Sequence, residues 1–228
     1  MTGAPIAGLS VSWERVTFAY DGADVLHDIS LAIAPGECVA LTGHNGAGKT
    51  TLTRMLMGLV RPRTGRVAVG DWDVAGKRPH QMARRVGYAF QHADQQLFAK
   101  TVREDVAFGP RQLGLGEAHV DDVLREMALD GVADRHPYDL PAPLRKVVSL
   151  AGVFAMRTGV LVLDEPTAGF DRELRALVVS ALRRRVADGV TVIAISHDLG
   201  LVDAVAERRV TLDAGRVTAD VPASPAST

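Results

Sequence analysis

The chain has 228 residues, and its 26 Lys and Arg residues nearly balance its 27 Asp and Glu residues, which gives a net charge of −1 at pH 7. This balance offers no electrostatic argument for nucleic acid as a partner. A hydrophobic content of 47% is enough for one large core, which must be aliphatic because only 5% of the residues are aromatic. The single cysteine, Cys38, excludes a disulfide within the chain and a Cys-rich metal site.

Strand and helix patterns alternate along the chain. Strands are predicted at residues 11–19, 29–33, 37–41, 86–90, 160–163 and 191–195. Helices are predicted at residues 51–57, 102–108, 120–129, 144–156 and 172–187. The first two strands are expected to pair antiparallel through a turn at Asp21 and Gly22. The last two strands are continuous aliphatic runs, which is typical of parallel strands buried on both faces.

Two stretches depart from this alternation. Between residues 91 and 139 the strand pattern disappears, and Pro110, Gly114 and Gly116 join helical stretches, which indicates a helical insertion in an α/β core. Residues 221–228 are of low complexity and are expected to be disordered. Residues 1–10 lack a signal-peptide pattern, and the longest apolar run, residues 147–156, is too short for a membrane span. We therefore expect a soluble cytosolic protein that reaches a membrane only through partners.

Residues 43–50 read GHNGAGKT, between a predicted strand and a predicted helix. In that context the glycines allow a tight turn whose N–H groups surround phosphates, at the positive end of the helix dipole. Lys49 supplies a positive charge, and the Thr50 hydroxyl is placed to ligate Mg²⁺. The pattern predicts binding of a nucleoside triphosphate. The residues expected to hold it are Gly43, His44, Asn45, Gly46, Ala47, Gly48, Lys49, Thr50 and Thr51.

A pair of carboxylates forms the second candidate site. Asp164 and Glu165 follow the aliphatic strand at residues 160–163, at the edge where ligands bind in open α/β sheets. Asp164 is expected to hold Mg²⁺ directly or through water. Glu165 is expected to act as a general base that polarises the attacking water.

These motifs have the order seen in the ATP-binding cassette (ABC) ATPases, which the chain resembles from residue 11 to about residue 220. The resemblance implies ATP and Mg²⁺ as cofactors and an α/β fold. That fold is a P-loop NTPase core with a mostly parallel sheet flanked by helices, an N-terminal antiparallel β-element and a helical insertion. It implies a single ABC ATPase domain at residues 10–220, with the insertion at about residues 92–157.

The resemblance also assigns roles to individual residues. Tyr20, in FAYDG, matches the aromatic residue that stacks on adenine. Gln91, in YAFQ, matches the glutamine that reaches Mg²⁺ and the attacking water. His197, in AISHD, matches the histidine that hydrogen-bonds the γ-phosphate. Asp171 matches an aspartate that communicates across the dimer of nucleotide-binding domains.

One motif departs from the family pattern. The signature loop, usually Leu-Ser-Gly-Gly-Gln, reads LPAPL at residues 140–144. Pro141 removes the serine hydroxyl, Ala142 adds a Cβ, Pro143 has no N–H, and Leu144 replaces the glutamine. The following helix is expected to survive, because proline is tolerated in a first helical turn. Since the family uses this loop to bind ATP held by the other subunit, we expect a heterodimer with a second cassette whose signature is intact.

Residues 91–98 (QHADQQLF) and 101–110 (TVREDVAFGP) resemble one branch of the family, the energy-coupling-factor importers, although Ala93 stands where their loop usually has proline. The resemblance implies a transmembrane coupling protein and a substrate-capturing membrane protein as partners. It places the chain at the cytoplasmic face of the cell membrane, in uptake of a vitamin or a transition-metal ion. Two alternatives remain open: a nucleotide-binding but hydrolytically silent regulatory subunit, and a non-transport ABC ATPase. A simple phosphotransferase is less favoured, since nothing resembles a lid over an acceptor substrate.

Overall fold

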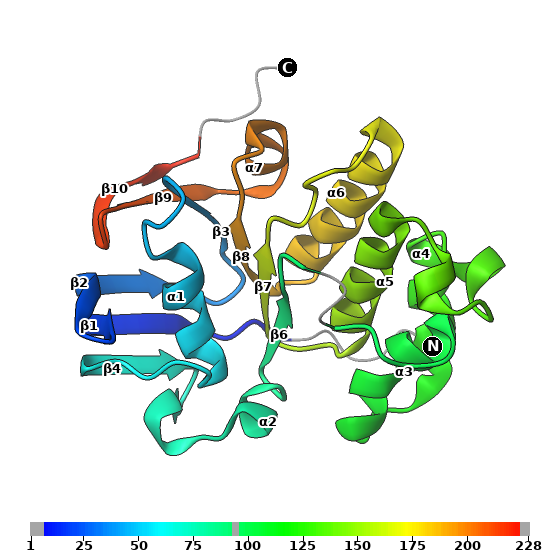
Figure 1. Cartoon of the computed structure of the whole chain (residues 1–228), viewed down its shortest axis with the longest axis horizontal. Coiled ribbons are helices and arrows are strands. Elements are labelled where there is room, and N and C mark those ends of the chain that lie inside the picture. Colours follow the sequence, from blue (N-terminus) through cyan, green and yellow to red (C-terminus); the bar gives the residue numbers. More distant parts are fainter. Residues whose placement is uncertain (1–6, 93–95, 224–228) are drawn as a thin grey trace.

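The structure is a computed structural model that describes residues 7–92 and 96–223. The strands form two sheets (Figure 1). The antiparallel sheet contains, in spatial order, β2 (Ala23–Ile33), β1 (Val11–Tyr20), β4 (Thr64–Val69) and β5 (Trp72–Asp73). The larger sheet contains, in spatial order, β10 (Arg216–Pro222), β9 (Arg208–Asp213), β3 (Cys38–Thr42), β8 (Thr191–Ile195), β7 (Val160–Asp164) and β6 (Val86–Ala89). This sheet is parallel from β9 to β6, and only β10 pairs antiparallel.

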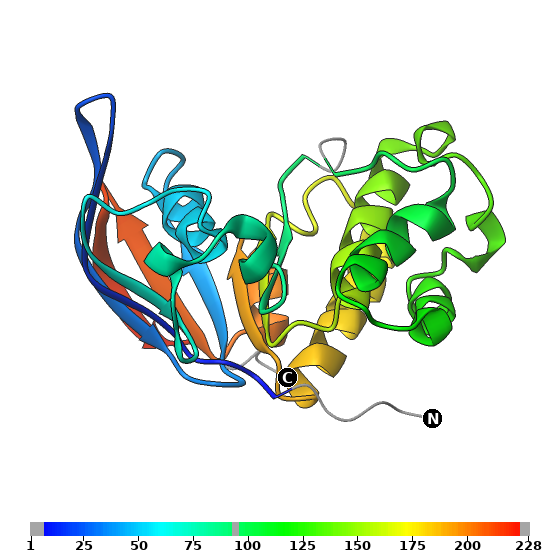
Figure 2. The ribbon, with the colours of Figure 1, turned by 90° about the horizontal axis from the view of Figure 1, so that it is seen from below.

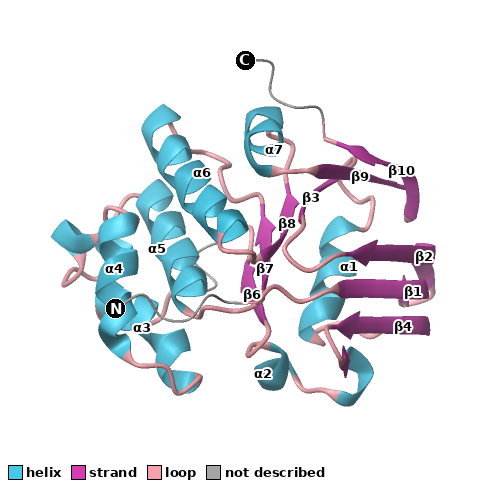
Figure 3. Ribbon diagram, turned by 180° about the vertical axis from the view of Figure 1, so that it is seen from behind, coloured by secondary structure: helices cyan, strands magenta, loops and turns pink. Residues whose placement is uncertain are grey.

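The helices lie on both faces of the larger sheet (Figure 3). They are α1 (Lys49–Arg54), α2 (Pro79–Met82), α3 (Val102–Gln112), α4 (Val120–Glu126), α5 (Ala142–Ala155), α6 (Arg172–Ala187) and α7 (Leu199–Val205). Short 3₁₀ turns are η1 (Met55–Met57), η2 (Val74–Gly76), η4 (Glu117–His119), η5 (Asp130–Val132) and η6 (Pro137–Asp139). Figure 2 shows α3, α4 and α5, in green, as a group beside the sheets.

Two hydrophobic cores lie on opposite faces of the larger sheet. In β7, Val160 and Val162 belong to the core that contains α1 and the antiparallel sheet, whereas Leu161 and Leu163 belong to the core that contains α5 and α6. Successive side chains of a strand point to opposite faces, so each core receives every second residue. Every residue of β7 and β8 is buried, as the continuous aliphatic runs predict.

The fold class is confirmed: the core is an α/β sheet with an N-terminal antiparallel element, and within the described residues no strand lies between β6 and β7. The turn at Asp21 and Gly22 is confirmed as well. Some boundaries differ. The second strand begins at Ala23 instead of residue 29, because its pairing with β1 continues to the turn. The first helix covers Lys49–Arg54 and is followed by the 3₁₀ turn η1.

The prediction that Pro110 lies between helices is wrong, because it lies in the last turn of α3, where its missing N–H removes only one helical hydrogen bond. The predicted disordered tail is also wrong in part. Val221 and Pro222 belong to β10 and pair with Arg209 and Arg208. The rest of that prediction, for residues 224–228, lies outside the described residues, as does Ala93.

Candidate functional site

The loop that joins β3 to α1 has a backbone that requires glycine at two positions. Gly43 has φ 132°, and a Cβ on it would lie 1.9 Å from the carbonyl oxygen of Leu212. Gly48, the N-cap of α1, has φ 100°, and a Cβ on it would lie 2.6 Å from Leu26 Cδ2. Because a Cβ does not fit at either position, glycine allows the loop to pack closely against Leu212 and Leu26.

Lys49, the first residue of α1, hydrogen-bonds with its side chain to the main chain of the loop that precedes it. Its Nζ donates to the carbonyl oxygens of Gly43 (2.6 Å) and His44 (2.9 Å). Burial lowers the pKa of Lys49, and the carboxylates of Glu165 and Asp164 act in the opposite direction. The ammonium group therefore lies between the loop and the two carboxylates that were predicted to act on ATP.

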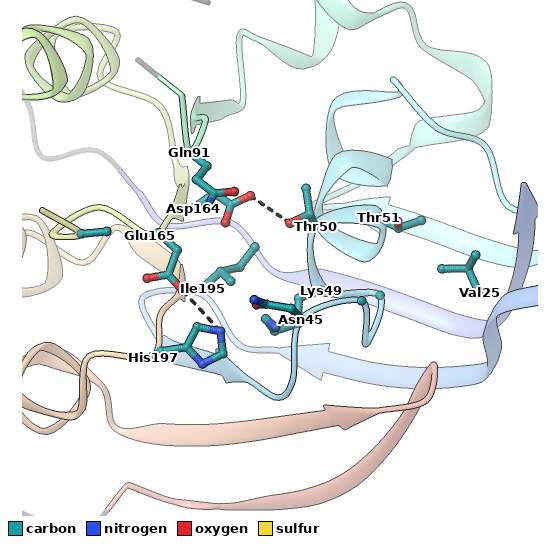
Figure 4. Close-up of a pocket in the computed structure, with 13 residues that line it drawn as sticks. Val25, Asn45, Lys49, Thr50, Thr51, Gln91, Asp164, Glu165, Ile195 and His197 are labelled. Carbon is teal, nitrogen blue, oxygen red and sulfur yellow. Dashed lines mark hydrogen bonds and ion pairs between the residues drawn. The ribbon is translucent and has the colours of Figure 1, made fainter. Parts of the chain in front are cut away.

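Thr50 and Asp164 meet across the gap between α1 and β7. The Thr50 hydroxyl donates to Asp164 Oδ2 at 2.9 Å (Figure 4). Asp164 is buried, and this burial raises its pKa, while the Thr50 hydrogen bond and the charges of Arg54, Lys49 and Lys146 lower it. A hydroxyl and a carboxylate in contact are the hard oxygen donors that Mg²⁺ prefers, so the residues fit the predicted metal.

Glu165 follows Asp164 in a conformation that is unusual for a glutamate. Its φ is 51°, in the left-handed region, and its N–H donates to the carbonyl oxygen of Ile195 at 2.8 Å. Its Oε1 lies 3.6 Å from Nε2 of His197, which follows β8 (Figure 4). The pKa of Glu165 is raised, first by burial and also by Asp164, whereas His197 lowers it. Left-handed non-glycine residues cost about 1–2 kcal/mol and are often found at functional sites.

These residues line one cleft of about 590 Å³. The predicted site residues in its wall are Asn45, Gly46, Gly48, Lys49, Thr50, Thr51, Gln91, Asp164, Glu165 and His197. Three further lining residues, Val25, Ala168 and Ile195, were not predicted, because none of them carries a motif of its own. Gly43, His44 and Ala47 belong to the loop but not to the cleft wall.

Tyr20 lies outside the cleft wall. It is the last residue of β1, its side chain is 45% exposed, and its ring packs edge-on against Phe18 with 4.6 Å between centroids. Val25, after the turn that follows Tyr20, lines the cleft instead. The stacking role of Tyr20 therefore stays a prediction.

Residues 141–144 lie at the start of α5 and do not line the cleft. The predicted helix is confirmed: Pro141 is the N-cap, and its carbonyl oxygen accepts the N–H of Arg145 at 3.1 Å. Pro141 has no side chain with which to cap the helix. Leu144 is half-buried and packs against the core around α5 and α6.

Gln96 is a polar residue that the sequence analysis did not single out. Its Oε1 accepts hydrogen bonds from the N–H of Phe90 (3.1 Å) and the hydroxyl of Ser149 (2.6 Å), and its Nε2 donates to the carbonyl oxygen of Tyr88 (2.9 Å). It thus joins the end of β6, which precedes Gln91, to the middle of α5. Its position in QHADQQ was the available signal, but nothing in the sequence distinguishes its role from that of its neighbours.

Asp171 has a clear local role, since its Oδ1 accepts the N–H of Leu174 at 2.9 Å as the N-cap of α6. We expect Asp171→Ala to lower the free energy of unfolding by about 1 kcal/mol, as loss of an N-cap does. Asp171→Asn should retain most of the stability, and Asp188→Ala at the other end of α6 serves as control. Urea unfolding followed by circular dichroism measures the difference. Equal stability of Asp171→Ala and the wild type would show that the cap contributes nothing.

Over the described part of the chain, no helix combines the length and the apolar character that crossing a membrane requires. The same residues contain no group of three or more His, Cys, Asp or Glu side chains arranged to hold a metal ion.

The fold and the cleft define a P-loop nucleotide-binding domain. The family model described as "ABC transporter" matches residues 26–168. The chain belongs to the ABC transporter family.

Named relatives agree with this. The cobalt import ATP-binding protein CbiO of Rhodobacter capsulatus is 41% identical over 91% of this chain and 76% of its own length. A putative ABC transporter ATP-binding protein of Bifidobacterium longum is 41% identical over 91% of this chain, but the match spans only 30% of that protein. A solved structure of cbiO1 from Clostridium perfringens, described as part of the ABC transporter complex cbiONQ, has a TM-score of 0.82. It is 30% identical, and the match covers 93% of this chain and 88% of that one.

Proposed function

We propose that this chain is the ATP-hydrolysing subunit of a membrane importer of the energy-coupling-factor type. The observation that carries the proposal is the convergence of Lys49, Thr50, Asp164, Glu165 and His197 on one cleft. Relatives named as cobalt import and energy-coupling-factor ATP-binding proteins support the branch of the family. Uptake of a transition-metal ion or a vitamin is inferred from that branch of the family and not from any residue of this chain.

The cleft suggests how ATP would be held. The loop N–H groups and the dipole of α1 favour the phosphates, and Lys49 can exchange its carbonyl partners Gly43 and His44 for phosphate oxygens. Thr50 and Asp164 would hold Mg²⁺, with Gln91 beside them in the same cleft wall. When bound, Mg²⁺ neutralises charge that develops on the phosphates.

Glu165 is the residue best placed to accept a proton from the attacking water. Burial raises its pKa, which makes the carboxylate a stronger base, and it lines the same cleft as Asp164 and the phosphate loop. His197, across from Glu165, can donate a hydrogen bond to the γ-phosphate.

The loop at residues 140–144 argues for a heterodimer. It offers no hydroxyl, no N–H at Pro143 and no polar side chain at Leu144. Hydrogen bonds to a charged group contribute about 1.5–3 kcal/mol each, so losing two of them would slow a site by about a hundredfold or more. We therefore propose a second ABC ATPase subunit with an intact signature loop as partner. A transmembrane coupling protein and a substrate-capturing membrane protein would hold both subunits at the cytoplasmic face of the membrane.

The same loop also allows a second candidate function, a nucleotide-binding subunit that regulates a transporter without hydrolysing ATP. In that case the cleft described here would bind ATP but not cleave it. Retention of Glu165 and His197 in the cleft supports the hydrolytic alternative. The two functions predict different effects of a Glu165 substitution on the rate of ATP cleavage by the assembled complex. The rate should fall if this chain hydrolyses ATP and should stay unchanged if it only regulates.

Lys49→Ala should weaken ATP binding by about 10–100-fold, because a charged hydrogen-bond donor contributes about 1.5–3 kcal/mol. Isothermal titration calorimetry with ATP and Mg²⁺ measures the effect on the purified chain. Lys100→Ala is the matched control, since Lys100 is exposed and lies outside the cleft wall. An unchanged affinity in Lys49→Ala would contradict the assignment of residues 43–50 to the phosphates.

A further inference from the structure

Lys146 joins the helix that begins at residues 141–144 to the loop that carries Glu165. It lies in the second turn of α5, and its Nζ donates to the carbonyl oxygen of Glu165 at 2.5 Å and to that of Ala168 at 3.2 Å. The ammonium also lies 5.6 Å from the centre of the Phe170 ring. One side chain therefore contacts three residues of the segment that follows β7.

The main chain of Glu165 is fixed on both sides. Its N–H donates to Ile195 of β8, and its carbonyl oxygen accepts from Lys146. The residue has φ 51°, and a left-handed residue that is not glycine persists only where its surroundings hold it. The first of these bonds is made by main-chain atoms only. The second depends on the side chain of Lys146, which can be replaced.

The surroundings of Lys146 favour these bonds. The side chain is partly buried between α5 and the loop, which reduces the access of water that could replace the two carbonyl partners. Burial lowers the pKa of Lys146, and Glu165 and Asp164 act against that change by favouring the charged form. A bare hydrophobic side chain at this position would leave the carbonyl oxygens of Glu165 and Ala168 without this donor.

We propose that Lys146 is a positioning residue that holds the Glu165 main chain in the conformation from which its carboxylate acts on the attacking water. The proposal rests on the proposed function of Glu165. Displacement of a catalytic group by about 1 Å can slow a reaction by about a hundredfold, so a contact that does not touch ATP can still set the rate. The contact between Lys146 and Glu165 would also link the N-terminal turns of α5, which begin at Pro141, to the catalytic carboxylate of the same subunit.

The test compares Lys146→Met, Lys146→Arg and the control Lys100→Met in the complex with the partner cassette. We expect Lys146→Met to slow single-turnover ATP cleavage by about 10–100-fold while KM for ATP changes less than about threefold. Lys146→Arg keeps donors and charge and should recover most of the rate. Hydrogen–deuterium exchange on the isolated chain without ATP should be faster over residues 165–170 in Lys146→Met only.

Two results would overturn the proposal. One is an unchanged cleavage rate in Lys146→Met, and the other is a loss of ATP affinity that parallels the loss of rate without faster exchange at residues 165–170. Glu165→Gln in the same complex distinguishes a failure of the positioning role of Lys146 from a failure of the proposed function. If that substitution leaves cleavage unchanged, the hydrolytic role of the chain is wrong, and unchanged exchange in Lys146→Met then overturns the positioning role independently.

Discussion

Glu165→Gln should slow ATP cleavage by the assembled transporter by about 10²–10⁴-fold, the range that a general base contributes. Glutamine has nearly the same shape as glutamate and can keep the main-chain hydrogen bonds to Ile195 and Lys146, but it cannot accept a proton. ATP binding should therefore persist, because the proposed phosphate contacts come from residues 43–51 and not from Glu165. Phosphate release measured on the complex, and nucleotide binding by calorimetry, separate the two effects.

The control for this substitution is Glu14→Gln, since Glu14 is exposed on β1 and lies outside the cleft wall. It should leave both the rate and the affinity unchanged. If Glu165→Gln has no effect on the rate, ATP is cleaved at the other site of the complex. The silent regulatory subunit would then be the better description of this chain.

Much of the fold follows from local sequence patterns, because the buried strands carry continuous aliphatic runs and the helices carry clear start signals. Residues 172–187 illustrate this, since α6 has the predicted bounds and Asp171 as its N-cap. Two of the strands that were missed, β10 and β4, have weak patterns. None of the residues of β10 is buried, and β4 has three exposed residues before its buried half. Pairing with a neighbouring strand, and not burial, defines such strands.

The sequence predicted those parts of the site whose residues lie close together along the chain. The run GHNGAGKT predicts a phosphate loop, and six residues of the expected 43–51 set line one cleft with Asp164 and Glu165: Asn45, Gly46, Gly48, Lys49, Thr50 and Thr51. Val25 and Ile195 line the cleft only because the two sheets bring them there. Lys146 contacts Glu165 across 19 positions of the chain through the packing of α5 on the larger sheet. A contact of that kind has no signature in the sequence.

The chain purified alone should hydrolyse ATP very slowly, even at concentrations at which it forms dimers. In such a dimer both composite sites would face a loop with proline at residues 141 and 143. A partner cassette with an intact signature should increase turnover by about a hundredfold or more, since each restored charged hydrogen bond contributes about 1.5–3 kcal/mol. The gain should arise at the site that contains Lys49 and Glu165 of this chain, and it should be lost in Glu165→Gln.

Whether the loop at residues 141–144 causes the slow hydrolysis can be tested in this chain without a partner. A combined variant, Pro141→Ser, Ala142→Gly, Pro143→Gly and Leu144→Gln, restores the missing donors at the start of α5, a helix that already forms. It should raise the ATPase activity of the isolated chain at high protein concentration, with a rate that depends on concentration because the site forms only in the dimer. Pro141→Ala alone is the control, because it adds a main-chain N–H at residue 141 but no side-chain hydroxyl. Robust, cooperative hydrolysis by the unmodified chain would overturn the argument, since the loop would then be competent without those donors and a heterodimer would no longer be needed to explain its sequence.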